Sequence, residues 1–334
     1  MFDLPHVAVL PAEHQTDRDI ARFADWVEFC TLISEVGSVS RADAVDIVND
    51  SMLLGNLAGD LYPTDKGFDE KNAFSPHDDT ERLMAQVWQG LRLRTETLRM
   101  GYPITVTRHR VDRRPPDWRE IPGFMMLLIM DLSRFYDGIE VIAKPDTALA
   151  RLFEKVVEAS TQGLFGGTSV RFGWPIEPKW PTPIDDRIRQ LGELLSLNVE
   201  NLEDKTGPKD KDRGLDVVGR LSFGDNGPGT LFFLTQCAIG KHWTKKSGEP
   251  SKGKWKHILN WNGELIRAIA VPWRLDEDTP PLTNYVRAHA HFDALILDRP
   301  RLISGNPDRW LKDKDKGEIT AWCEAQIQKF PRLR

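Results

Sequence analysis

The chain has 334 residues, of which 40% are hydrophobic and 28% are charged, a composition that is ordinary for a globular protein. Its longest apolar run, residues 124–130, is far shorter than the roughly 18 residues that a membrane span needs. The N-terminus carries an early acid and lacks the basic segment of a signal peptide. Three widely spaced cysteines form no zinc or disulfide pattern. We therefore expect a cytoplasmic protein without a membrane segment.

The net charge of −5 hides two segments of opposite sign. Residues 1–60 carry three Lys or Arg and eleven Asp or Glu, whereas residues 205–256 carry eleven and five. A basic segment inside an acidic protein indicates a polyanionic partner, although a solvated loop surface gives the same composition.

The first 140 residues have the pattern of a mostly helical region. Apolar residues recur at helical spacing over 19–35, and the pattern predicts further helices over 41–48 and 124–136. Thr80 can cap another helix that contains Leu83, Val87, Leu91 and Leu98. Residues 108–122, rich in Pro and charge, predict a loop.

A cluster of Gly and Pro over 138–145 marks the expected domain boundary. We expect a helical domain over 1–144, used for regulation, assembly or partner binding, and a second domain over 145–334. In the second domain the pattern predicts helices over 146–160, 185–197 and 318–328, and strands over 215–223, 230–236, 265–271 and 294–297. This order predicts an α/β fold with a mixed sheet flanked by helices.

The hairpin formed by the first two of these strands carries the most informative pair of residues. Its turn, Gly224-Asp225-Asn226-Gly227-Pro228-Gly229, places Asp216 within one residue of Gln236 across the ladder. Opposed Cβ atoms lie about 4.5–5.5 Å apart. A carboxylate in the apolar strand Leu215-Asp216-Val217-Val218 needs a partner, which is either a divalent cation or a base such as Arg220 or Lys241.

These segments resemble a known family. Phe153-Glu154 in an amphipathic helix, Gly214-Leu215-Asp216-Val217-Val218 and Phe232-Phe233-Leu234-Thr235-Gln236-Cys237 are similar to the Mrr-like branch of the PD-(D/E)XK restriction endonuclease superfamily. The resemblance covers residues 146–300 and implies a restriction-endonuclease-like mixed sheet. It also implies that Glu154, Asp216 and Gln236 hold Mg²⁺ or Mn²⁺ and that the substrate is DNA.

One departure from the family pattern affects the catalytic lysine. The family places this lysine two residues after the Gln, where this chain has Ala238. Lys241 could take over its role of orienting water and stabilising charge, with Lys245 as a weaker substitute. Ordinary phosphate or solvent contact is the alternative role for Lys241, and Asp212 is either an extra acid or a solvated loop residue.

The position of the helix acid has competitors. Glu193 lies on the second predicted helix, but Phe-Glu at 153–154 matches the family better. Glu158 shares the face of Glu154 and is either a second ligand or an exposed acid.

Further residues are candidates for nucleic-acid or metal contact. Lys241, Lys245 and Lys246 surround Trp243, and an aromatic ring among lysines either stacks on a base or belongs to a satellite core. His289 and His291 share one strand face and could bind zinc, although such pairs are more often polar strand residues.

The sequence thus predicts a Mg²⁺-dependent DNA endonuclease of restriction or anti-phage type, with a defence partner or a second copy bound through the N-terminal region. The alternatives are a nuclease fold without catalysis that binds DNA or assembles complexes, which Ala238 favours, and a metal hydrolase that uses His289 and His291.

Overall fold

The computed structural model describes residues 2–5, 17–58, 76–98, 101–136, 139, 141, 146–200, 202, 212–221, 223–224, 229–240, 242–246, 248–275 and 294–332. The chain divides into two compact units, Met1–Glu140 with Trp322–Arg334, and Val141–Ala321. The sequence expectation keeps residues 145–334 together, whereas residues 322–334 belong to the first unit. None of the helices in these ranges is long and apolar enough to cross a bilayer.

In its described residues the first unit combines helices α1 to α4 and the end of α11 (Asp313–Ile327) with a small antiparallel sheet of order β1-β3-β2. Its helices are α1 (Asp17–Ile33), α2 (Arg41–Ala58), α3 (Pro76–Leu98) and α4 (Pro122–Leu132), and its strands are β1 (Ser38–Ser40), β2 (Ile104–Val106) and β3 (Arg110–Arg113). Single 3-10 turns cover Trp118–Glu120 and Ser133–Phe135. The expected helices are therefore present, together with a sheet that the sequence did not indicate.

Two expectations for the first unit are wrong. Residues 108–122 contain β3, in which Val111 is buried and pairs with both neighbouring strands. Helix α3 begins at Pro76, so Thr80 is buried inside it and does not cap it. In both cases tertiary packing overrides a weak local signal, because a four-residue strand with one apolar side chain has little propensity of its own.

The second unit is a mixed α/β structure around a five-stranded sheet of order β10-β9-β7-β6-β4. These strands are β4 (Ser169–Arg171), β6 (Val217–Arg220), β7 (Thr230–Cys237), β9 (Gly263–Ala270) and β10 (Leu295–Leu297). Strand β6 runs antiparallel to β4 and β7, whereas β7, β9 and β10 are mutually parallel. The predicted hairpin and both later strands are confirmed, and β4 is an addition.

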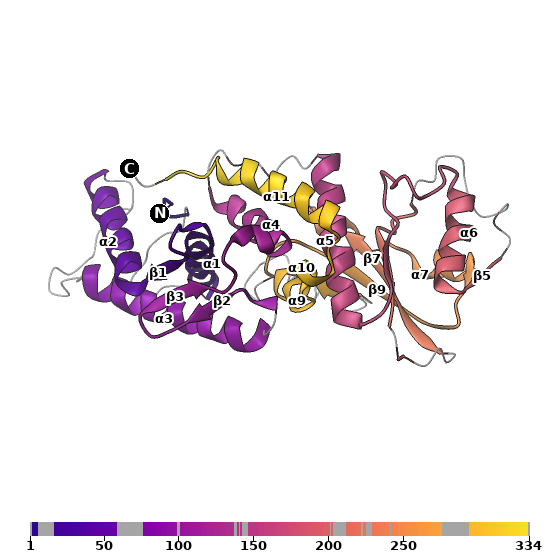
Figure 1. Ribbon diagram of the computed structural model, residues 1–334, viewed down its shortest axis with the longest axis horizontal. Coiled ribbons are helices and arrows are strands. Elements are labelled where there is room, and N and C mark those ends of the chain that lie inside the picture. Colours follow the sequence, from indigo (N-terminus) through magenta and orange to yellow (C-terminus); the bar gives the residue numbers. More distant parts are fainter. Residues whose placement is uncertain are drawn as a thin grey trace, which may run out of the picture. The chain divides into compact units, whose positions relative to one another are not determined.

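Helices cover both faces of this sheet (Figure 1). On one side lies α5 (Thr147–Phe165), which Asp146 caps by accepting a hydrogen bond from the Leu149 amide at 2.7 Å. On the other side lie α6 (Ile184–Leu195) and α7 (Lys252–Lys256), together with the short pair β5 (Asn198–Val199) and β8 (Leu259–Asn260). Short helices α9 (Arg299–Ser304) and α10 (Pro307–Trp310) pack near α5 and precede α11 (Asp313–Ile327).

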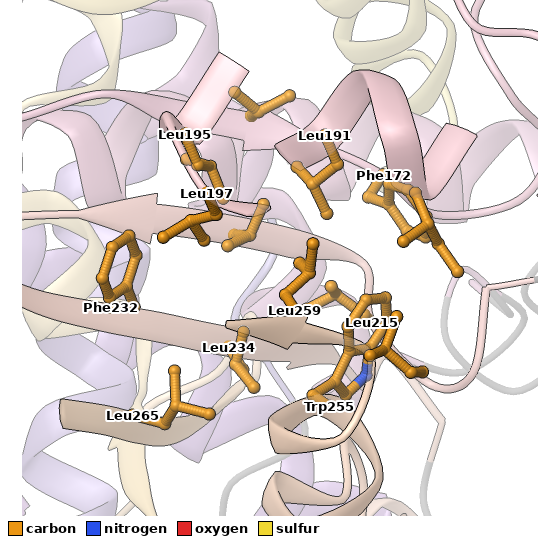
Figure 2. Packing of buried hydrophobic residues seen from close by; sticks show 14 of the residues in the cluster. Phe172, Leu191, Leu195, Leu197, Leu215, Phe232, Leu234, Trp255, Leu259 and Leu265 are labelled. Atoms are coloured by element: carbon orange, nitrogen blue, oxygen red, sulfur yellow. The ribbon is translucent and has the colours of Figure 1, made fainter. Parts of the chain in front are cut away.

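The main core of the second unit fills the space between the sheet and α6 (Figure 2). Leu191 and Leu195 project from the helix toward Phe232, Leu234 and Leu265 on the strands. Side chains alternate along each strand, so Arg171, Val217 and Phe233 point to the opposite face, where Phe165 of α5 stacks on Phe233. The two packed faces fix the strands that carry the candidate site.

Two leucines on α6 provide a matched test of this core. Leu191 is fully buried, whereas Leu194 is 49% exposed on the same helix. Replacing Leu191 with Ala should lower the free energy of unfolding by about 2–5 kcal/mol, because it removes buried methyl groups and leaves a cavity. Leu194→Ala should cost less than about 1 kcal/mol. Urea denaturation followed by circular dichroism measures both, and equal losses would contradict this packing.

Candidate functional site

The register of the hairpin brings Asp216 and Gln236 together at one end of the sheet. The ladder pairs Val217 with Thr235, so the next two residues outward, Asp216 and Gln236, face each other. The side-chain amide of Gln236 donates a hydrogen bond to Asp216 Oδ2, and the Cys237 backbone amide donates another at 2.6 Å. The two side chains meet as the hairpin predicts, but through the amide nitrogen of Gln236 and not through the amide oxygen that the prediction placed beside the carboxylate.

Glu154 reaches the same point from α5. Gly173, which follows β4, lies between the two acids: a Cβ atom on it would stand 2.7 Å from Glu154 Oε2 and 3.0 Å from Asp216 Oδ1. The backbone amides of Phe172 and Gly173 donate to the Asp216 carbonyl at 2.8 and 3.0 Å. The absence of a side chain at Gly173 thus leaves room for the two carboxylates, which pack against its backbone.

Arg171 is the cation beside these acids, and the sequence pattern did not indicate it. Its guanidinium is completely buried, with Nη2 2.7 Å from Glu154 Oε2 and hydrogen-bonded to the Pro175 carbonyl at 2.8 Å. Arg171 ends β4, a strand of three residues whose position depends on pairing with β6. No local sequence signal distinguishes such a short strand from a loop.

The site holds more negative than positive charge. Burial raises the pKa of Glu154, and the Asp216 carboxylate raises it further against the opposing effect of Arg171. Burial likewise raises the pKa of Asp216, although the Cys237 amide opposes this. The nearby Asp212 carboxylate further raises the pKa of both groups. A proton or an additional cation would therefore stabilise the pair.

Asp212 is held close to this pair. It accepts hydrogen bonds from the Gly214 amide at 2.9 Å and the Trp174 amide at 3.3 Å. Trp174 is 40% exposed, and the Arg187 guanidinium lies 5.8 Å from its ring and 5.4 Å from that of Phe172. An exposed aromatic ring next to Gly173 is a feature that the sequence did not reveal, because Trp174 lies far along the chain from Asp216.

The oxygen atoms of the site suit a hard cation in kind. Glu154 and Asp216 offer carboxylates, and Gln236 Oε1 is buried without a hydrogen-bond partner. That amide oxygen lies toward Gly214 and Glu249, so it would have to exchange places with the amide nitrogen to join the two carboxylates. Nowhere in the described ranges do three His, Cys, Asp or Glu side chains gather to hold a metal ion.

The predicted lysines have different environments. Lys241 lies outside the described residues. Lys246 donates a hydrogen bond to the Cys237 carbonyl at 3.4 Å, and its charge acts to lower the pKa of Asp216. Lys245 is exposed on the same 3-10 turn, Trp243–Lys246. Lys246 is thus the lysine of this segment whose ammonium the structure connects with the site.

The remaining candidates have different outcomes. Trp243 is buried, so its ring is not presented to a base on the surface. Glu193 is exposed on α6, on the opposite side of the sheet from α5. Glu158 contacts Lys312 at 3.9 Å and accepts the Arg171 backbone amide. His289 and His291 lie outside the described residues.

Comparison of this chain with protein-family models, with curated proteins and with solved structures finds no match.

The raised pKa values predict how stability depends on pH. A native carboxyl with a raised pKa keeps a proton that the unfolded chain has already lost, so stability should fall as pH rises above the usual carboxyl range. We expect the free energy of unfolding, measured without divalent ions from about pH 5 to about pH 8, to fall less steeply in Asp216→Asn than in the wild type. Glu193→Gln, an exposed control, should keep the wild-type slope. An unchanged slope in Asp216→Asn would exclude Asp216 as the source.

Proposed function

We propose that this protein is a divalent-metal-dependent endonuclease that hydrolyses phosphodiester bonds in DNA. The observation that carries the proposal is the convergence of the Glu154 and Asp216 carboxylates at Gly173, with Gln236 opposite Asp216. Two buried acids with raised pKa values at one end of a sheet are typical of a functional site more than of a structural ion pair.

The arrangement of elements supports a PD-(D/E)XK-like core. Helix α5 supplies the acid, the β6–β7 hairpin supplies Asp216 and Gln236, and the mixed sheet continues into β9 and β10. This is the order that the resemblance of residues 146–300 implies. A restriction or anti-phage role, with the first unit binding a partner protein or a second copy, follows from the same resemblance.

The chemistry divides between the cation and the side chains around it. Glu154, Asp216 and Gln236 would hold Mg²⁺ or Mn²⁺, and the ion would supply polarisation of the phosphodiester and a lower pKa of the attacking water. Arg171 keeps Glu154 oriented, and the Cys237 amide keeps Asp216 oriented. Lys246 contributes positive charge beside Asp216, which favours an approaching phosphate.

A second candidate function is DNA binding or assembly without catalysis. Ala238 stands at the place of the family's lysine, and its amide donates to Ala270 within the sheet. The guanidinium of Arg171 already compensates Glu154, and the Gln236 amide nitrogen already satisfies Asp216. In this alternative the site is a buried polar network that maintains the fold, and DNA binding is independent of metal and of Asp216.

Plasmid cleavage separates the two candidates. Purified protein should nick supercoiled DNA with Mg²⁺ or Mn²⁺, and Asp216→Ala should lower the rate at least about a hundredfold. Glu154→Gln should have a similar effect, whereas Glu193→Gln should leave the rate unchanged because Glu193 lies on the other side of the sheet. Cleavage that persists in Asp216→Ala would assign the activity to another site or to a contaminant.

Metal binding provides a readout that does not depend on turnover. Calorimetric titration with Mn²⁺ should detect binding in the wild type and a loss of about 10–100-fold in affinity in Asp216→Asn. Salt-sensitive DNA binding without metal binding or cleavage, and equal in both proteins, would instead support the non-catalytic alternative.

A further inference from the structure

A basic pocket lies beside α5, away from Gly173. Its cavity of about 230 Å³ is formed by three segments of the second unit: α5, residues 176–179 after β4, and the beginning of α11. Five of its lining side chains are cationic, namely Arg151, Lys155, Lys179, Lys312 and Lys314, and two are anionic, Glu177 and Asp315. When Glu158 and Glu318 beside the lining are counted as well, one positive charge remains in surplus, and an anionic ligand would neutralise it.

The inner part of the pocket is a built feature rather than a chance cluster of surface lysines. The Lys155 side chain is only 4% exposed, and its ammonium donates hydrogen bonds to Asp315 and, at 3.1 Å, to Glu318. Arg151 Nη1 lies 3.0 Å from the same Glu318 carboxylate. These acids fix the positions of the Arg151 and Lys155 side chains. Less side-chain conformational entropy is therefore lost when a ligand binds.

The outer part of the pocket consists of exposed and adjustable lysines. Lys179 contacts Glu177 at 3.2 Å, and Lys312 contacts Glu158 at 3.9 Å, with their side chains 45% and 62% exposed. Lys314 is exposed as well. Ion pairs of this kind are weak in water, so a ligand with a higher charge density can displace the carboxylates.

The pocket and the candidate metal site share the same helix. Arg151 lies three residues before Glu154 on α5 and Lys155 one residue after it, which is about 4.5 Å and 1.5 Å along the helix axis. Glu158 connects the two sites further, because it contacts Lys312 and accepts the backbone amide of Arg171.

We propose that this pocket binds a terminal phosphomonoester of a nucleic-acid strand. A phosphomonoester carries up to two charges and three free oxygens, which match an Arg and several Lys better than a carboxylate does. A small cavity suits a strand end, whereas a continuous strand needs an open groove. The assignment to a strand end rests on the proposed function, but phosphate binding itself does not require a metal.

Binding measurements with one oligonucleotide in three forms test the proposal. The forms carry a 5′-phosphate, a 3′-phosphate or two hydroxyl ends, with an internal fluorescent label, and EDTA prevents cleavage. We expect one phosphorylated form to bind about tenfold more tightly than the hydroxyl form. Equal affinities for all three forms would overturn the proposal.

Two double variants with the same loss of charge separate the pocket from general electrostatics. Lys312→Gln with Lys314→Gln should abolish the preference for the phosphorylated strand. Lys254 and Lys256 are exposed on α7 and do not line the pocket. Replacing both with Gln should weaken the binding of all three oligonucleotide forms equally and keep the preference for the phosphorylated strand. Loss of the preference in the α7 variant but not in the pocket variant would also overturn the assignment.

Competition identifies the source of the phosphate. If inorganic phosphate or deoxyadenosine monophosphate competes as strongly as the phosphorylated strand does, the pocket binds a free phosphomonoester. Weaker competition by these small molecules supports the strand end. Equal competition by a phosphoserine peptide would overturn the nucleic-acid assignment. The preference should persist in Asp216→Asn, so failure of the nuclease proposal, judged by Asp216→Ala on plasmid, is distinguishable from failure of this one.

Discussion

The burial of two carboxylates against a single guanidinium is the constraint on which the second unit depends. Glu154 and Asp216 are 4% and 6% exposed, and Arg171 is the fully buried cation beside Glu154. Leaving a buried charge without a partner is costly, so the surrounding backbone contributes the Cys237 amide and a residue without a side chain, Gly173. The fold holds these groups together although the two carboxylates share a single guanidinium.

The parts of this site that the sequence predicted are those set by local rules. Asp216 meets Gln236 because a hairpin with a centred turn pairs residues of constant index sum, and the observed register agrees with that prediction to within one residue. Glu154 lies on α5, whose apolar stripe and Asp146 cap are both visible in the sequence. Each of these signals depends only on nearby residues or on one turn, so it can be recognised in the sequence without the tertiary structure.

The residues that complete the site depend on contacts between distant segments. Arg171 and Gly173 enter through β4, which has three residues and forms only because β6 lies beside it. The burial of Trp243 is equally a tertiary property, since aromatic rings among lysines occur both on surfaces and in cores. The sheet of the first unit follows the same rule, because β3 contains one buried apolar side chain between two partner strands. Short elements of this kind are specified by their neighbours more than by their own sequence.

The two candidate functions differ in which group completes the charge balance at Asp216. A proton or the Gln236 amide nitrogen does so in a structural network, whereas a divalent cation does so in a nuclease and requires the amide oxygen to turn inward. Rotation of the Gln236 side-chain amide by half a turn thus converts the arrangement of one state into that of the other. In the nuclease that we propose, one helix carries the acid Glu154 and, on an adjacent stripe, Arg151 and Lys155 of the basic pocket. A structural carboxylate pair would not by itself account for such a pocket, whereas the proposed nuclease would use its positive charge to hold a terminal phosphate.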